Sequence, residues 1–446
     1  MLAATDELTQ ARQAVFNAQM DYGQLYLAEY RLGKILQSRG NLTGSLISFS
    51  HAYEHLEFIR TSLNSSKEQF QTQIKPVYYA YADVLLQSNQ LEKAQRVMES
   101  FKDFELKDYF QDACVSKIEK KVTELSDNTA VIYPIILPNR LELLVNIPNG
   151  IKRVSVDVSG NKFKETAIKF HKNLQKRGGA FVKQSKQLYD WLIKPITPIL
   201  NQLSIQTIVI IPDDVLRLVP ISALMPGKKR FLIEDYAIAT TPSLYLTEPK
   251  ILDSINVMLN GVSESVQGFT QLKHVKLEIV TLSSLMGGNS FLDSQFKLDD
   301  LVHNLKANDY QIIHIATHAQ FNRDPEKTFI LTYDDKLTMN RLESLFEDKS
   351  IELLTLSACQ TAKGDERAAL GLAGVAIKAG ARSALASLWA VQDKSTALLM
   401  QEFYKGLNDR LSKAKALQQA QIKLISQKKF RHPNNWAPFL LIGNWL

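Results

Sequence analysis

Four short apolar runs in the second half of the chain restrict the fold more than any other feature. They are TIVIIPDD from residue 207, YQIIHIATHA from residue 310, IELLTLSAC from residue 351 and SALASLWAVQD from residue 383. Helical segments separate them, and runs that are apolar on both faces and joined through helices are typical of a parallel sheet covered on both sides. The pattern therefore predicts an α/β architecture with a mostly parallel sheet.

The region before these runs has two parts. Residues 1–125 show helical periodicity throughout, with scarcely any proline. From residue 130, AVIYPIILPNRLELLVNIPNGIKRVSVDV alternates apolar and polar residues between Pro-Asn and Asn-Gly turns, which predicts a β-meander at about 130–158. We therefore expect an all-α domain over 1–125 and an α/β domain over 126–446.

Two pieces of the helical region look alike. They are LGKILQSRGNLTGSLISFSHAYEHLEFI from residue 32 and YADVLLQSNQLEKAQRVMESF from residue 81, and each contains Gln-Ser and a polar turn between two helical stretches. This arrangement resembles the tetratricopeptide repeat, although the two copies lie farther apart than its usual period of about 34 residues. The resemblance implies stacked hairpins whose surface binds a partner; the alternative is a helical collar that only packs on the other domain.

Three of the apolar runs lead to residues that can carry out chemistry, namely His318, Cys359 and Asp393. Sites in parallel α/β sheets gather at the carboxyl ends of strands, so these side chains lie together if their strands are neighbours. A histidine beside a cysteine can take the thiol proton or stabilise the thiolate, which is the nucleophilic form. The polar segment QTAKGDE behind Cys359 cannot be core, which argues against a thiol that is merely buried.

Other candidate residues are interpreted structurally. His314 and His318 share one face of a strand, but at ~3.3 Å per residue they lie about 13 Å apart, too far to bind one metal ion. His314 is therefore expected to be a buried histidine that supports its strand. Cys114 is expected in the core or an interface, and Asp213 and Asp214 are expected in a turn. We expect no metal and no cofactor.

Composition restricts the location and the partners. The chain has 446 residues, a formal net charge of +7 and only two cysteines, so neither a disulfide framework nor a cysteine metal site is expected. No window has the apolar length that a bilayer span needs, and the N-terminus lacks the pattern of a secretion signal, so we expect a cytoplasmic protein without a membrane partner. The basic stretch from residue 404 is interpreted as a helix with a solvated face, and direct nucleic-acid binding is not expected.

The segment from about Val131 to the C-terminus resembles the CHAT domain, a caspase-like peptidase module often fused to tetratricopeptide repeats. Its landmarks occur in order: IVIIPDDVLRLVPISAL, RFLIEDYAIATTPSL, IIHIATHAQF, LLTLSACQTAKG, GLAGVAIKAGARSALASLWAVQD and NNWAPFLLIGNW. The resemblance implies clan-CD cysteine peptidase chemistry with His318 and Cys359 as the dyad. It also implies an oxyanion hole formed by the backbone N–H groups of Ala319 and Cys359, with Ala319 standing where caspases have glycine.

Asp393 has two interpretations. In separases, which share this chemistry, an aspartate in a similar Leu-Trp-x-Val-x-Asp-Lys context faces the basic P1 side chain of the substrate, and LWAVQDK fits that pattern. The resemblance therefore implies a pocket for Arg or Lys. Asp393 also precedes the helical run KSTALLMQEFYKGL, where an N-cap aspartate is common. We expect the cap, with the pocket as an added role.

The expected function is that of a cysteine endopeptidase that cleaves a specific partner protein after a basic residue. We expect activation by a regulatory protein or ribonucleoprotein that binds the helical domain. The alternative is a catalytically silent scaffold that uses the helical repeats to recruit an effector. Bacterial proteins of this type resemble components of defence or regulated-proteolysis systems, including RNA-guided complexes.

Overall fold

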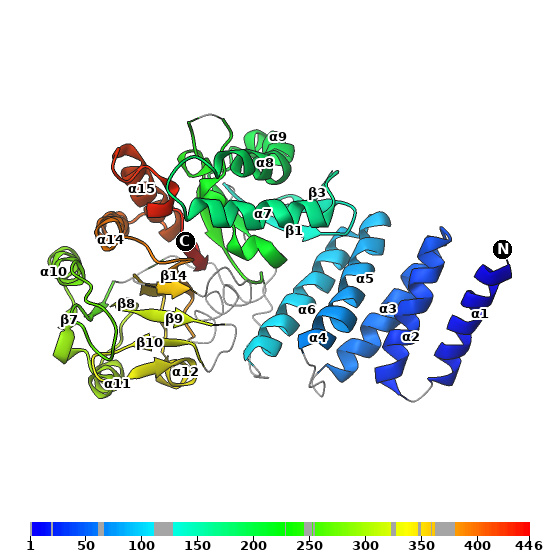
Figure 1. The fold of residues 1–446 in the computed structure, drawn as a ribbon, viewed down its shortest axis with the longest axis horizontal. Helices are drawn as coiled ribbons and strands as arrows, with labels where there is room; N and C mark the ends of the chain where they lie inside the picture. Colours follow the sequence, from blue (N-terminus) through cyan, green and yellow to red (C-terminus); the bar gives the residue numbers. More distant parts are fainter. Residues whose placement is uncertain are drawn as a thin grey trace. The chain divides into compact units, whose positions relative to one another are not determined.

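The structure of the chain, a computed structural model, describes residues 2–18, 21–60, 67–110, 128–227, 229–244, 252, 255–322, 327–346, 349–357, 359–361 and 380–446. Two compact units make up the chain, Met1–Val115 and Ser116–Leu446 (Figure 1). The domain boundary expected at 125–126 and Cys114, expected in the core or an interface, both lie outside the described residues.

Helices alone make up the described part of the first unit, and successive helices pack against one another (Figure 1). Within that part, α2 packs against α3, α3 against α5 and α5 against α6. The bounds are α1 Leu2–Asn17, α2 Tyr22–Ser38, α3 Leu42–Ile59, α4 Lys67–Gln69 with the π-helical turn Phe70–Ile74, α5 Lys75–Gln87 and α6 Leu91–Phe110. No helix of the described chain is both long and apolar enough to span a bilayer.

Local sequence explains the α2–α3 hairpin. Asp21 accepts hydrogen bonds at 2.9 and 3.2 Å from two amides in the first turn of α2, and Asn41 accepts one at 2.9 Å from the first turn of α3. These side chains satisfy amides that a helix start leaves without partners. Gly33 allows the two helices to approach closely, because a Cβ there would lie 2.6 Å from the ring of the buried Phe49. The hairpins α2–α3 and α5–α6 are the two similar pieces of sequence, so the expected helical repeat architecture is confirmed.

The second unit is built on a large sheet. Eleven strands of the described chain form it, in the order β3-β2-β1-β4-β5-β15-β14-β12-β8-β6-β7. The bounds are β1 Thr129–Ile136, β2 Leu141–Ile147, β3 Gly150–Val156, β4 Thr207–Ile210, β5 Ala237–Thr240, β6 Val257–Gly261, β7 Asn289–Leu292, β8 Ile312–Ala316, β12 Leu353–Leu356, β14 Ser383–Ser387 and β15 Phe439–Gly443.

The large sheet has two halves that run in opposite directions. Strands β1, β4, β5 and β15 are parallel to one another, with β2 and β3 completing an antiparallel meander on β1. Strand β14 pairs antiparallel with β15, and β14, β12, β8, β6 and β7 are again parallel to one another. The predicted mostly parallel α/β sheet is confirmed, and the carboxyl ends of its two halves lie at opposite edges.

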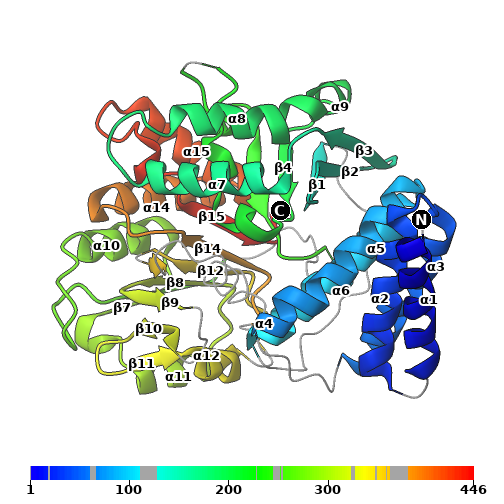
Figure 2. The same ribbon diagram turned by 45° about the vertical axis from the view of Figure 1, so that its right-hand side comes forward.

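Helices cover both faces of this sheet, which explains why its central strands are mostly apolar. Strands β4, β8, β12 and β14 are buried along their whole length. Figures 1 and 2 show α10, α14 and α15 next to one another on one side, with α11 and α12 on the other side. The helix bounds are α7 Gly160–Leu174, α8 Val182–Leu192, α9 Thr197–Gln202, α10 Val275–Met286, α11 Leu298–Ala307, α12 Met339–Phe346, α14 Asp393–Asn408 and α15 Lys413–Ser426.

A second, smaller sheet continues two central strands of the large one. Its described strands follow the order β11-β10-β9-β13, with bounds β9 Ala319–Phe321, β10 Phe329–Leu331, β11 Lys336–Thr338 and β13 Cys359–Thr361. β9 begins three residues after β8 ends, and β13 begins three residues after β12 ends. The neighbours β8 and β12 therefore both lead into the small sheet, where β9 and β13 pair in parallel again.

Candidate active site

The three residues singled out in the sequence follow neighbouring strands. Strands β14, β12 and β8 are adjacent and parallel, so their carboxyl ends meet at one edge of the large sheet. His318 comes two residues after the end of β8, Cys359 three residues after the end of β12, and Asp393 six residues after the end of β14. The strands are shorter than predicted, because the chain has already left the large sheet before each of these residues. The three strands are neighbours, which is the condition on which the expected proximity of these residues depends.

The backbone places Cys359 next to the residue that follows His318. Cys359 is the first residue of β13, and its register partner on β9 is Ala319. Neighbouring strands lie about 4.8 Å apart, so the main chains of residues 318–319 and 359 are close neighbours. The Cys359 side chain lies outside the part of the chain that the structure describes.

His318 is held by the loop between β6 and α10. Its side chain is buried, its Nε2 lies 2.7 Å from the carbonyl oxygen of Thr270, and its ring packs on Phe269 with centroids 5.2 Å apart. A carbonyl oxygen only accepts hydrogen bonds, so Nε2 must carry the hydrogen. In the neutral imidazole, Nδ1 then has a free lone pair and can accept a proton. The histidine is thus arranged as a base that acts through Nδ1.

Ala319, expected to supply an oxyanion N–H, is buried in the small sheet. It pairs with Cys359 on one side and with Ile330 of β10 on the other. The His318 carbonyl accepts a hydrogen bond of 2.9 Å from Leu331, which fixes the peptide between His318 and Ala319. The assignment of the Ala319 and Cys359 N–H groups to an oxyanion hole stays a prediction.

The prediction that Asp393 caps its own helix is wrong. The N-cap of α14 is Gln392, whose backbone is extended, and Asp393 is the first helical residue. Its carboxylate instead accepts a hydrogen bond of 2.6 Å from the backbone N–H of His274, where α10 begins. The extended conformation of Gln392 shifts the helix start by one residue and turns the aspartate toward α10, which packs against α14.

Asp393 lies in an electrostatic environment shared with His318. Burial raises the pKa of the Asp393 carboxyl, against the lowering effect of the His274 amide and of positive charge on His274 or His318. The nearby carboxylate of Glu278 raises the pKa further. An additional cation close to the Asp393 carboxyl would therefore stabilise its charged form. The pocket role of Asp393 stays a prediction.

A buried polar cluster lies beneath the histidine, formed by His314, Thr355, Tyr404 and Glu278. His314 and Thr355 are register partners on β8 and β12, four residues before His318 and Cys359. The Tyr404 hydroxyl donates to Thr355 Oγ1 at 3.0 Å and lies 3.2 Å from His314 Nδ1, and Glu278 Oε1 lies 3.0 Å from His314 Nε2. All four residues are buried. His314 is therefore a buried histidine that supports its strand, as predicted.

Asp213 and Asp214 do not belong to this site. They follow β4, whose half of the sheet runs in the opposite direction, so they lie at the edge opposite to His318. The buried Asp213 accepts a hydrogen bond of 3.0 Å from the Ile136 amide, and Asp214 forms an ion pair of 2.7 Å with Lys164. Both are structural, as the turn interpretation suggested.

Sequence reasoning missed the residues that hold His318. Phe269 and Thr270 lie 49 and 48 residues before it in a loop without a recognisable pattern, and Thr270 acts through its carbonyl, which every residue has. The sole available signal was the turn composition of SVQGF between β6 and α10. That signal indicates a turn but no partner.

Comparison with known proteins gives one family match. The sequence model described as CHAT domain matches residues 182–444, which include the strands and all three candidate residues at the carboxyl edge. The match begins later than the resemblance expected from about Val131.

The individual proteins that are similar to this chain align with it over less than half of their own length. Tetratricopeptide repeat protein 28 of Mus musculus is 35% identical over 97 residues, and its Homo sapiens counterpart is 33% identical over 96 residues. Each alignment covers 21% of this chain and 4% of the relative. The crystal structure of the Saccharomyces cerevisiae separase-securin complex aligns with a TM-score of 0.46 and 10% identity, over 99% of this chain and 37% of that one.

Proposed function

The chain belongs to the CHAT domain family, within the caspase-like superfamily of cysteine peptidases, and on this premise we propose that it is an endopeptidase with Cys359 as nucleophile and His318 as base. The observation that carries the proposal is the parallel pairing of β9 with β13, which sets Cys359 opposite the residue after His318. The hydrogen bond from His318 Nε2 to Thr270, which leaves Nδ1 available as a base, supports it.

The proposed reaction uses these groups in turn. His318 Nδ1 takes the thiol proton of Cys359, and the sulfur attacks the carbonyl carbon of the scissile peptide. The N–H groups of Ala319 and Cys359 stabilise the oxyanion of the tetrahedral intermediate. The imidazolium then returns its proton to the leaving amine as the C–N bond breaks and a thioester forms. Water, deprotonated by the same imidazole, hydrolyses the thioester and restores the thiol.

We propose that the substrate is a partner protein cut after Arg or Lys, with Asp393 facing the basic side chain. Its place after β14, its partial burial and the electrostatic effect of His318 on it support this role. Asp393→Asn provides a sharp test, because the amide oxygen can still accept the His274 N–H bond while the charge is lost. A charge-assisted hydrogen bond contributes about 1.5–3 kcal/mol, so cleavage after Arg or Lys should fall about 10- to 100-fold. Equal rates after neutral and basic residues in both proteins would contradict the pocket.

We propose that the helical unit recruits the partner that switches the peptidase on, a regulatory protein or a ribonucleoprotein. Its stacked hairpins support this role, because such repeats present extended binding surfaces. Full activity of the purified chain without any partner would count against it.

The test of the endopeptidase itself is a comparison of new protein N-termini. A lysate of the source cells is incubated with the wild-type chain, with Cys359→Ala and with Cys114→Ala as the control for the other thiol. We expect new N-termini with wild type and Cys114→Ala and none with Cys359→Ala. If Cys359→Ala produces the same N-termini, the endopeptidase proposal fails. If none of the three produces them while all three retain a common bound protein, the scaffold function replaces it.

A further inference from the structure

The loop of residues 263–274, between β6 and α10, has to hold His318 although most of it is exposed. It carries Phe269 and Thr270, the two contacts of His318 described above. Gln267 and Thr270 are themselves exposed, so burial cannot fix them. The position of the Thr270 carbonyl therefore depends on hydrogen bonds that hold the loop at other points.

Asp293 holds the beginning of the loop. Its carboxylate accepts hydrogen bonds from the Ser263 amide at 2.6 Å, from the Ser263 hydroxyl at 2.8 Å and from the Glu264 amide at 3.2 Å. Asp293 has a φ of 53°, in the left-handed region that non-glycine residues rarely adopt. Such strain persists where surrounding bonds fix it, and it is concentrated at functional sites.

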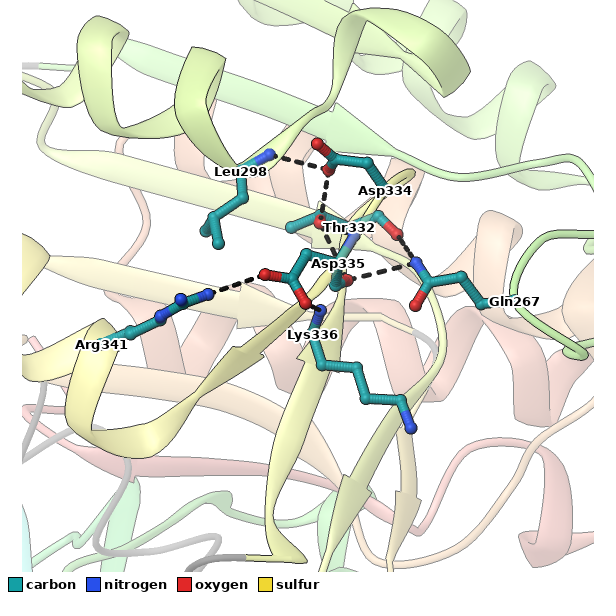
Figure 3. A network of polar contacts seen from close by, with 7 residues as sticks. All are labelled: Gln267, Leu298, Thr332, Asp334, Asp335, Lys336 and Arg341. Carbon is teal, nitrogen blue, oxygen red and sulfur yellow. Dashed lines mark hydrogen bonds and ion pairs between the residues drawn. The ribbon is translucent and has the colours of Figure 1, made fainter.

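Gln267 holds the middle of the loop. Its side-chain amide donates to the carbonyl oxygens of Thr332 and Asp335, at 3.0 and 3.3 Å, in the turn between β10 and β11 (Figure 3). It also donates to the Tyr333 carbonyl oxygen at 3.3 Å. Gln267 also has a left-handed φ, of 52°, and Gly268 follows it with 81°. The left-handed pair directs the chain toward the turn and then back to Phe269.

The turn that receives Gln267 is itself fixed. Thr332 Oγ1 donates to the Asp335 carbonyl at 2.9 Å, and Asp334 accepts a bond of 3.0 Å from the first amide of α11, at Leu298 (Figure 3). Asp335 pairs with Arg341 at 2.8 Å and accepts the Lys336 amide at 2.8 Å, and both contacts hold its pKa below the usual value. Gln267 thus connects the loop to a rigid part of the small sheet.

We propose that Gln267 and Asp293 are positioning residues for the peptidase, which keep the Thr270 carbonyl on His318 Nε2 and so keep Nδ1 directed at the Cys359 thiol. This inference rests on the proposed function of the dyad. Neither side chain touches the reacting atoms, and both act through the loop. A displacement of about 1 Å at a catalytic group can cost about 100-fold in rate, so loss of either anchor should lower kcat about 10- to 100-fold with little change in KM.

The variants are chosen to separate this role from general stability. Gln267→Met keeps the size of the side chain and removes the donors. Gln418→Met is its matched control, because Gln418 on α15 also donates from Nε2 to a backbone carbonyl, that of Ile233, at 2.8 Å. Asp293→Ala removes the acceptor and disfavours the left-handed φ, whereas Asp293→Asn retains an acceptor and tolerates that φ. Asn should therefore rescue most of what Ala loses.

The experiment uses two measurements on the full chain. One is kcat and KM on a fluorogenic peptide amide with arginine before the cleaved bond. The other is the proton NMR signal of His318 Nε2–H, assigned by its loss in His318→Ala and observable because the hydrogen bond to Thr270 slows its exchange with water. We expect Gln267→Met and Asp293→Ala to have a lower kcat and to lose the Nε2–H signal. Gln418→Met and Asp293→Asn should keep most of the wild-type kcat and the signal.

The outcomes distinguish the inference from the function on which it rests. If the wild-type chain cleaves nothing but Gln267→Met and Asp293→Ala still lose the Nε2–H signal, the positioning holds and the peptidase proposal fails. If both variants keep the signal, or if Gln418→Met loses as much as they do, the positioning inference is overturned.

Discussion

The hydroxyl group of Tyr404 offers a quantitative test of how the two strands below the dyad are held together. It bonds to Thr355 on β12 at 3.0 Å and lies 3.2 Å from His314 Nδ1 on β8. The Tyr404 oxygen is thus a hydrogen-bond partner of both strands, since a hydroxyl group can donate one hydrogen bond and accept another. Tyr404→Phe removes this oxygen and keeps the ring, and burial leaves no water to replace it.

The structure gives the expected magnitude. A lost hydrogen bond costs about 1 kcal/mol net, and a buried donor or acceptor left without a partner costs about 1–3 kcal/mol. The Thr355 hydroxyl can rotate toward another group, whereas His314 Nδ1 is fixed by the 3.0 Å contact of Nε2 with Glu278 on the far side of the ring. We therefore expect Tyr404→Phe to lower the free energy of unfolding by about 2–4 kcal/mol, more than most single substitutions.

Tryptophan fluorescence during urea unfolding is a suitable assay. The four tryptophans of the chain, Trp191, Trp389, Trp436 and Trp445, all lie in the second unit, so the helical unit contributes no signal. The denaturant midpoint should fall while the slope of the transition stays unchanged.

Tyr189→Phe on α8 is the matched control. The Tyr189 side chain is half-buried, and its hydroxyl makes no hydrogen bond with any residue that the structure describes. If the two variants differ by less than about 0.5 kcal/mol, the range of ordinary surface changes, the cluster does not connect the strands as argued.

Three further perturbations have defined outcomes. Burial lowers the pKa of Lys413 to about 8. Between pH 8 and the unfolded value of 10.5 the unfolded chain therefore binds more protons than the folded chain. Across this range the free energy of unfolding should rise with pH by about 3 kcal/mol in the wild type but not in Lys413→Met. Burial tends to raise the pKa of Glu142, but hydrogen bonds from Arg153 and Arg140 lower it below 4.5. The ionised carboxylate therefore stabilises the fold, and this stabilisation is lost as the pH falls through the lowered pKa. Glu142→Gln should remove this acid dependence of the urea midpoint. Gly443→Ala should reduce the yield of folded protein sharply, because Gly443 has a φ of 90° and a Cβ would lie 2.4 Å from the Arg382 carbonyl oxygen; ordinary solubility and a native fluorescence spectrum would contradict this.

Much of the architecture was predictable because it follows from short-range pattern. The runs around Ile313, Leu354 and Leu385 are apolar on both faces, and that pattern directly indicates a covered parallel sheet. Parallel neighbours have their carboxyl ends at one edge, so the closeness of the segments that carry His318 and Cys359 followed from the fold class. The burial of His314 followed from its place within an apolar strand.

The parts that could not be predicted depend on contacts between distant segments. Asp393 bonds to His274, 119 residues away, and no local signal distinguishes that contact from an N-cap. The strands leading to His318 and Cys359 were drawn too long because an apolar run contains no mark where a chain passes from one sheet to another. The Thr270 carbonyl, finally, is a backbone group and leaves no trace in residue type.

Two neighbouring strands pass from the large sheet into the small one. The free energy needed to open the small sheet at the proposed dyad is therefore separate from the free energy needed to unfold the large sheet. The ladder between β8 and β12 involves buried residues of the main core, whereas β9 and β13 are three residues long each. Local opening of a protein follows the least stable cooperative segment, so amide hydrogen exchange should be faster at 319–321 than at 312–316. A ligand or a partner that separates β9 from β13 would therefore take the proposed dyad apart reversibly while the eleven-stranded sheet stays folded.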